Sequence, residues 1–303
     1  MASEYPAEGA TEQVEGATVV HHYLENKGVK IHYVETGKPP GQPVLLLHGW
    51  PEFWFSWAFQ LKALADAGFH VIAMDLRGYN FSDKPQKVEE YGADYIMSDV
   101  REVVQALGAG KPVHVVAHDW GGLVAWMFTE TYPELVIKLI QLNIPHPTVF
   151  GKALRGGNLR QIFRSWYMFL FGYPWLPEWL LSFNNYSWLK AVFKGTKVQT
   201  ADFTKRHVDA QALPGALTGG LNYYRALSKG LWTRPRKEIR QPVKVIWGED
   251  DTAMGKELAE PPKNRVPNQE VVFIPKASHW VYWDEPERVS EEILKFLTPT
   301  ASS

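Results

Sequence analysis

Continuous apolar runs alternate with helical patterns along most of the chain. Apolar runs of the kind expected for strands buried on both faces occupy residues 44–47, 71–74, 113–117, 136–142, 243–247 and 271–274. Apolar residues recur at helical spacing over residues 56–67, 96–107, 121–132 and 286–297. Residues 18–35 alternate around a turn at Lys27-Gly28 and predict a hairpin. The pattern predicts an α/β fold with a mostly parallel central sheet and helices on both faces.

The alternation of strands and helices stops after Pro145. From residue 146 to 232 no strand pattern occurs, and large apolar residues dominate segments such as 165–176. We therefore expect a helical cap at 146–232, inserted into a core formed by residues 18–145 and 233–303. The apolar stripe over residues 169–176 fits either a membrane-touching face or a roof over a substrate cavity. Its proline-broken pattern and the lack of a flanking basic face favour the roof.

Composition narrows the classes of function. The 303 residues carry a formal net charge of −1, so no basic surface is expected and nucleic acid is excluded as a partner. The chain has no cysteine, which excludes disulfides and thiolate ligands. No apolar run approaches the roughly 18–20 residues of a membrane span, and the first residues lack a secretory pattern. We expect a cytoplasmic protein with a flexible segment at 1–17, and the sequence does not distinguish a monomer from a homodimer.

The stretch 113–122 carries the first candidate for chemistry. A buried-type strand ends at Ala117, and Asp119 follows two residues before Gly121, where a helical pattern begins. Small residues on both sides of an apex residue are typical of a sharp strand–turn–helix elbow, which exposes the apex side chain beside a helix N-terminus. The alternative for Asp119 is a simple helix N-cap.

Two further polar groups follow later strands. Asp250 and Asp251 come directly after 243–247, and His279 follows 271–274 after a short loop. Because the carboxyl ends of parallel strands meet at one edge of a sheet, we expect these groups to lie near Asp119. Each has a structural alternative, since aspartates are common in turns and a lone histidine is commonly structural. The chain order of nucleophile, acid and histidine is that of the α/β-hydrolase fold.

Five motifs give the chain a resemblance to the epoxide hydrolases of the α/β-hydrolase fold over about residues 20–298. The motifs lie at 48–52 (HGWPE), 118–122 (HDWGG), 221–225 (LNYYR), 248–251 (GEDD) and 277–280 (ASHW). The resemblance implies that Asp119 is the nucleophile and His279 a general base. It also implies that Asp251, rather than Asp250, orients the histidine.

The resemblance assigns four more residues. Backbone N–H groups of Trp50 and Trp120 would form the oxyanion hole, and two cap tyrosines would assist ring opening. Tyr224 matches the first tyrosine, in the motif at 221–225. Tyr167 matches the second, with Tyr173 as the competing residue.

The implied reaction converts an epoxide to a vicinal diol. A carboxylate attacks the sp³ carbon of the ring and forms an alkyl-enzyme ester, which water activated by His279 then hydrolyses. The implied partners are a small hydrophobic epoxide and water, with no metal and no organic cofactor.

Three rival functions remain to be weighed. A haloalkane or haloacetate dehalogenase shares the aspartate nucleophile, and Trp120 suits a haloalkane enzyme, but Trp50 replaces the asparagine typical of that class and no arginine follows Asp119. A non-catalytic ligand receptor of this fold would be favoured by the loss of a triad residue or tyrosine, and none is lost. A serine esterase would need a Gly-x-Ser-x-Gly elbow, which the chain lacks.

Overall fold

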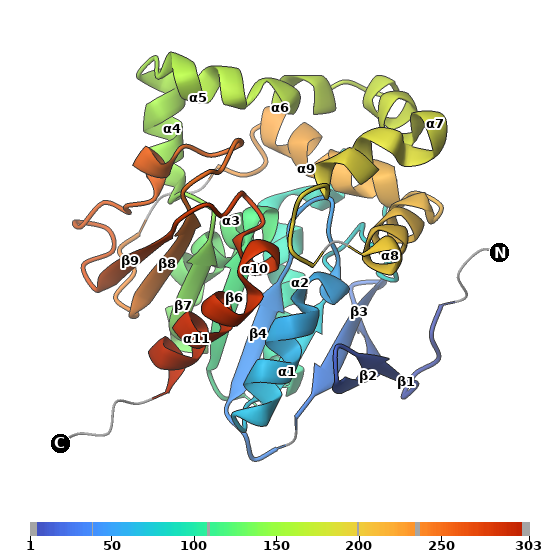
Figure 1. Ribbon diagram of the computed structural model, residues 1–303, viewed down its shortest axis with the longest axis vertical. Coiled ribbons are helices and arrows are strands. Elements are labelled where there is room, and N and C mark those ends of the chain that lie inside the picture. The colour runs from blue at the N-terminus through green and yellow to red at the C-terminus, as the bar shows by residue number, and fades with distance from the viewer. Residues whose placement is uncertain (1–4, 38, 108–109, 199, 234–236, 299–303) are drawn as a thin grey trace.

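A nine-stranded sheet forms the centre of the protein (Figure 1). The computed structural model describes residues 5–37, 39–107, 110–198, 200–233 and 237–298. In spatial order the strands run β1-β2-β3-β5-β4-β6-β7-β8-β9. Their bounds are β1 Thr11–Val14, β2 Ala17–Asn26, β3 Val29–Thr36, β4 Pro43–Leu47, β5 His70–Met74, β6 Val113–His118, β7 Val136–Leu142, β8 Val243–Gly248 and β9 Gln269–Ile274.

Strand direction divides the sheet into two parts. β1, β2 and β3 are antiparallel neighbours, and β3 also pairs antiparallel with β5. The strands from β5 through β4, β6, β7 and β8 to β9 are parallel. Every residue of β5, β6 and β8 is buried, which explains their unbroken apolar runs. The predicted hairpin and the mostly parallel sheet are confirmed.

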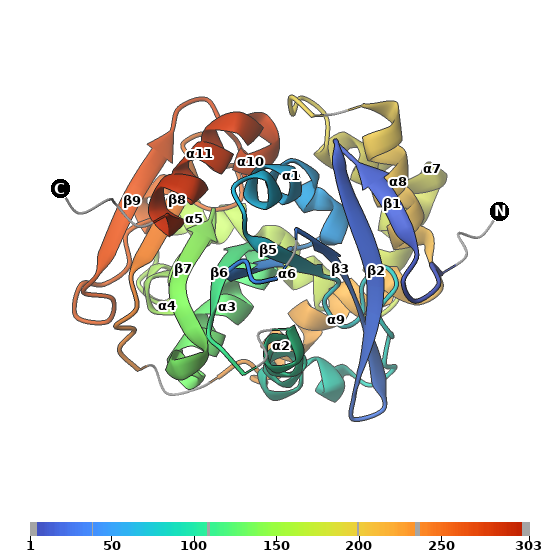
Figure 2. The same ribbon diagram turned by 90° about the horizontal axis from the view of Figure 1, so that it is seen from below.

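Helices cover both faces of the sheet, as predicted. Figure 2 shows α1, α10 and α11 on one face and α2 and α3 on the other. The bounds of these helices are α1 Ala58–Asp66, α2 Ala93–Leu107, α3 Asp119–Thr131, α10 Val281–Asp284 and α11 Pro286–Leu297. Short 3₁₀ turns lie at η1 Trp54–Trp57, η2 Val88–Tyr91, η3 Pro133–Leu135 and η4 Lys256–Leu258. None of the helices in the described parts of the chain combines the length and hydropathy of a bilayer span.

Between β7 and β8, the described residues form six helices. They are α4 Pro147–Arg155, α5 Leu159–Arg164, α6 Trp166–Phe171, α7 Leu176–Val192, α8 Ala201–Ala212 and α9 Ala216–Ser228. Figure 1 shows α4 to α7 arching over one end of the core, with α8 and α9 beneath them. α7 is interrupted at residues 183–186, whose backbone is not helical. We refer to residues 147–228 as the cap.

Two expectations need correction. Residues 11–14 of the segment expected to be flexible form β1, because Glu12 pairs with Arg206 of α8 and with His21 of β2; residues 1–4 lie outside the described residues. The apolar stripe at 169–176 does not act as a roof along its length. Phe171 is buried, whereas Phe169 is 72% exposed, because residues two apart project from nearly opposite sides of the helix α6. Trp175, in the turn before α7, is 74% exposed.

Candidate active site

Asp119 occupies the sharp turn between β6 and α3. Its φ of 48° lies in the left-handed region, which most residues with a side chain avoid. The turn requires a glycine two residues on, since a Cβ at Gly121 would lie 2.4 Å from the carbonyl oxygen of His48. The Asp119 carboxylate does not cap its own helix. Its Oδ1 accepts a hydrogen bond of 2.9 Å from the backbone N–H of Trp50, so it faces the loop after β4.

His279 lies between two carboxylates. Its Nδ1 is 2.7 Å from Oδ2 of Asp251, and its Nε2 is 3.6 Å from Oδ2 of Asp119. Asp251 is buried and also accepts hydrogen bonds from Asn143 and from two backbone N–H groups of the loop after β8. Asp250 is exposed. The structure therefore brings the predicted aspartate, acid and histidine together and separates Asp251 from its competitor.

The charges of this cluster shift the pKa values of its members. Burial alone would raise the pKa of Asp251, but the neighbouring His279 charge and hydrogen bond lower it below its ordinary value. Burial alone would lower the pKa of His279, but Asp251 and Asp119 raise it well above its ordinary value. The arrangement stabilises an imidazolium as long as both carboxylates are ionised.

Two cap tyrosines lie close to Asp119. Tyr224 of α9 and Tyr167 of α6 have ring centroids 6.2 Å apart, and both line the two cavities that contain Asp119. Burial, followed by the negative charge of Asp119, raises the pKa of both phenols above the ordinary value. Tyr173 is 62% exposed and lines neither cavity. Of the two candidates for the second tyrosine, Tyr167 is the one that lies near Asp119.

The two predicted oxyanion-hole residues flank Asp119 from different elements. Trp50 follows β4 and precedes Pro51 through a cis peptide bond, and its N–H points at the Asp119 carboxylate. Trp120 lies in the first turn of α3, and its indole packs edge-on against the ring of Tyr224 at 4.8 Å.

Two cavities of about 620 and 650 Å³ meet at Asp119 and the two tyrosines. Trp50, Trp188 and His279 line the first. Leu123, Phe150 and Trp232 are among the residues lining the second. Because both linings are rich in apolar and aromatic side chains, they suit a hydrophobic ligand whose middle lies beside Asp119.

Sequence reasoning missed some supporting groups of this site. Glu52 was noted only as part of a motif, yet its Oε2 accepts a 2.7 Å bond from the N–H of Gly49 and lies 3.1 Å from Nδ1 of His118. Burial would raise the pKa of Glu52, but His118 lowers it to about 2. Nε2 of His118 in turn lies 2.9 Å from the carbonyl oxygen of His279. Asn143, which bonds Asp251, could have been found as the polar residue directly after β7.

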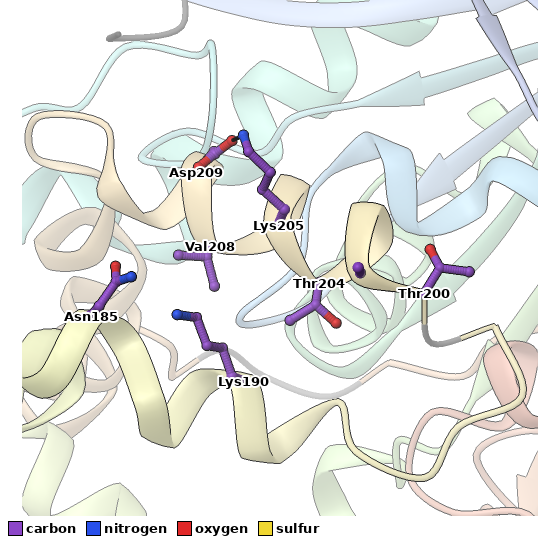
Figure 3. Close-up of a pocket in the computed structure, with 8 residues that line it drawn as sticks. Asn185, Lys190, Thr200, Thr204, Lys205, Val208 and Asp209 are labelled. Atoms are coloured by element: carbon purple, nitrogen blue, oxygen red, sulfur yellow. Dashed lines mark hydrogen bonds and ion pairs between the residues drawn. The ribbon is translucent and has the colours of Figure 1, made fainter.

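A further cavity of about 480 Å³ lies between α7 and α8 (Figure 3). Lys190 of α7 points across it toward Val208 of α8, and Lys205 pairs with Asp209. Its lining includes none of the predicted site residues. Within the described parts of the chain, no group of three or more His, Asp or Glu side chains is arranged to hold a metal ion.

Comparison with known proteins identifies the family of the chain. The sequence profile of the family described as alpha/beta hydrolase fold matches residues 42–286. Epoxide hydrolase 1 of Caenorhabditis elegans is 40% identical, and the match covers 91% of this chain and 69% of that protein. The AB hydrolase superfamily protein YfhM of Bacillus subtilis (strain 168) is 38% identical, over 91% of this chain and 96% of that protein.

A solved structure shows the same architecture. The crystal structure of Bacillus megaterium epoxide hydrolase in complex with an inhibitor superposes with a TM-score of 0.83 at 32% identity, covering 91% of this chain and 99% of that one. The predicted α/β-hydrolase fold and the resemblance are thus confirmed by sequence and by structure. The chain belongs to the epoxide hydrolases of the α/β-hydrolase fold.

Proposed function

We propose that the protein hydrolyses a hydrophobic epoxide to a vicinal diol through an ester on Asp119. The observation that carries the proposal is the placement of a carboxylate and an imidazole, 3.6 Å apart, beside two phenols that line the same apolar cavities. A carboxylate displaces at a strained sp³ carbon, whereas the carbonyl chemistry of esterases uses a serine.

Ring opening is the first step. A carboxylate oxygen of Asp119 forms a bond to one ring carbon, and the carbon–oxygen bond on the opposite side breaks. The departing oxygen carries the electron pair away as an alkoxide. Tyr167 and Tyr224 keep their protons because burial and the charge of Asp119 raise the pKa of each phenol. They can therefore donate hydrogen bonds to the developing alkoxide and supply its proton.

Ester hydrolysis is the second step. Esterification removes the negative charge of Asp119, which is one of the two charges that raise the pKa of His279. The imidazole then gives up its proton more readily, to the phenolate left by ring opening, and can take one from water, while Asp251 stabilises the resulting imidazolium. The hydroxide formed adds to the acyl carbon of the Asp119 ester. When the tetrahedral oxyanion collapses, the bond between that carbon and the alkyl oxygen breaks, and the imidazolium returns its proton to the departing alkoxide. The N–H of Trp50 already contacts the Asp119 carboxylate, and the N–H of Trp120 would be the second donor to the tetrahedral oxyanion. One such donor is typically worth about 3–4 kcal/mol.

The test is to stop the reaction between the two steps. In His279→Gln, ring opening should proceed and ester hydrolysis should stall. Incubation with styrene oxide is expected to add the mass of the epoxide to the peptide that contains Asp119, with little diol formed. His114→Gln removes another buried histidine, away from the cavities, and is expected to turn over without trapping an adduct.

The same assay distinguishes an epoxide hydrolase from the rival haloalkane dehalogenase. A haloalkane dehalogenase would release halide from a 1-bromoalkane and form no diol from styrene oxide. That result would overturn the proposal, as would undiminished diol formation in Asp119→Ala.

A further inference from the structure

The exposed apolar side chains of the protein are concentrated on the cap. Among the described residues, thirteen large apolar side chains are exposed, and ten of them lie between residues 159 and 188. Six are Phe or Trp side chains that are each more than half exposed: Phe163, Trp166, Phe169, Trp175, Trp179 and Phe183. We call these six residues the cap face. They belong to α5, α6, α7 and the turn before α7, which are elements of the arch of the cap in Figure 1.

Exposed aromatic side chains gathered on neighbouring elements are typical of an interaction site; α5 contacts α6, and α6 contacts α7. Soluble proteins rarely expose contiguous apolar patches of more than a few hundred Å² without a partner, although single exposed apolar residues are ordinary. Elsewhere in the described chain only Tyr5, Tyr95 and Phe273 are comparably exposed, and they lie on separate elements. The cap face is therefore a local feature and not a general property of the surface.

Charge identifies the kind of partner. Residues 147–198 contain seven Lys or Arg residues and one acidic residue, Glu178, although the whole chain has a net charge of −1. Glu178 is paired with Arg225, 2.8 Å away. Lys152, Arg160 and Lys194 are exposed on the same segment. The segment that carries the cap face thus has an excess of positive charge, although Lys197 pairs with Glu285, so the expectation that no basic face flanks the apolar stripe was wrong.

We propose that the cap face docks on the surface of an anionic phospholipid bilayer. Trp and Phe side chains favour the boundary between headgroups and acyl chains, and each nearby Lys or Arg adds attraction to anionic lipid. A second copy of the chain is a poorer occupant, because two cap faces in contact would bring two positively charged surfaces together. A bilayer supplies both the apolar layer and the opposite charge.

Docking would place the catalytic cavity against the lipid. Phe163 and Trp166 belong to the cap face and also line the cavity that contains Asp119 and His279. A hydrophobic epoxide dissolved in the bilayer could enter without crossing water. This consequence rests on the proposed function, whereas the docking itself does not.

Vesicle co-sedimentation with the full-length chain tests the docking and needs no turnover. Wild-type protein is expected to pellet with vesicles of phosphatidylcholine and phosphatidylserine, and to stay in the supernatant with phosphatidylcholine alone. Binding is expected to weaken as salt is raised, because salt screens the attraction to anionic lipid.

Two pairs of variants separate the apolar and charged contributions. Trp175→Ser with Trp179→Ser is expected to weaken binding roughly tenfold or more. The control is Tyr95→Ser with Phe273→Ser, which removes exposed aromatic area outside the cap. Lys152→Glu with Lys194→Glu is expected to weaken binding by roughly thirtyfold or more. Its control is Lys111→Glu with Lys295→Glu, at exposed positions in the core.

The outcomes are distinct. Failure of the wild type to bind anionic vesicles would overturn the proposal, as would undiminished binding by both cap variants. A dimer that the Trp175 and Trp179 substitutions dissociate, found together with absent vesicle binding, would assign the cap face to a second copy. The turnover of a water-soluble epoxide by Trp175→Ser with Trp179→Ser should match the wild type, so the result is independent of the proposed function.

Discussion

His279 lies beside two carboxylates whose charges behave differently during the proposed reaction. Asp251 keeps its charge throughout, held by Asn143 and two backbone N–H groups. Asp119 loses its charge when the ester forms. The pKa of His279 is therefore expected to be highest in the free enzyme and to fall in the intermediate, which is the only state in which the imidazole must accept a proton.

Replacing Asp119 with asparagine imitates that loss of charge. In Asp119→Asn, the pKa of His279 is expected to fall, because a neutral amide replaces the carboxylate whose Oδ2 lies 3.6 Å from Nε2. NMR titration of the imidazole measures the change. Asp250→Asn removes an exposed carboxylate near the same loop and should leave the titration close to that of the wild type. An unchanged or raised pKa in Asp119→Asn would contradict the proposed coupling.

The tyrosines are expected to act in ring opening alone. Tyr167→Phe and Tyr224→Phe should each slow formation of the alkyl-enzyme by roughly a hundredfold, the usual scale for a general acid, and leave ester hydrolysis nearly unchanged. Single-turnover kinetics separate the two steps. Tyr173→Phe is the matched control, since its exposed ring lies outside both cavities. A larger effect on hydrolysis than on alkylation would remove these tyrosines from the proposed role.

At the scale of elements, the elbow depends on the close approach of α3 to the loop after β4. Gly121 sits in the first turn of α3, where a Cβ would lie 2.4 Å from one backbone oxygen and 2.5 Å from another. Neither oxygen belongs to a flexible side chain, so the backbone itself would have to move. The elbow geometry and the stability of the core are therefore linked at this residue.

Gly121→Ala is expected to lower the free energy of unfolding by about 1–3 kcal/mol, the usual range for overpacking a tight site. Gly151→Ala is the control, because Gly151 lies within α4 and meets only the end of the Arg155 side chain. There the substitution should be neutral or stabilising by up to about 1 kcal/mol. Urea denaturation measures both values, and equal stability of the two variants would show that the elbow tolerates a Cβ.

Elements with a regular apolar pattern in the sequence were predictable. Elements that are ordered by contacts with distant residues were not. The six parallel strands and the helix at 286–297 agree with their apolar patterns because burial on fixed faces determines those patterns. β1 was missed because its four residues are mostly polar, and pairing with β2 and Arg206 orders them. The outward direction of Phe169 and Trp175 was missed because composition does not show which face of a cap helix meets the core.

At the scale of the whole molecule, the cap must hold Tyr167 and Tyr224 over a nucleophile that the core provides. The sequence could place Asp119, Asp251 and His279 at strand ends, since the parallel sheet brings those ends together. It could not choose between Tyr167 and Tyr173, because that choice depends on how α6 rotates against α9. Asn143, Glu52 and His118 support the site only through contacts that folding creates.

One ion pair ties two cap helices together. Arg225 of α9, next to Tyr224, donates to Glu178 of α7 at 2.8 Å and to the carbonyl oxygen of Tyr173 at 2.7 Å. Glu178→Ala is expected to lower the free energy of unfolding by about 1–3 kcal/mol, since it leaves a mostly buried guanidinium short of a charged partner.

The variant should also be cut faster within the cap in limited proteolysis. Asp66→Asn, which breaks the exposed pair with Lys62, is the control and is expected to change the unfolding free energy by no more than about 0.5 kcal/mol. Equal effects of the two substitutions would show that the Arg225 pair does not hold the cap.

Because two cavities meet at Asp119, the hydrolytic water and the alkyl chain of the proposed second step can lie on different sides of this residue. His279 lines only the first cavity, so the water that it activates must bind on that side. An alkyl chain that is esterified to Asp119 and extends into the second cavity leaves the position of this water free. A chain that fills the first cavity displaces the water and prolongs the lifetime of the ester. Substrates of equal reactivity would then differ in how long the enzyme stays alkylated, according to which way their bulk points.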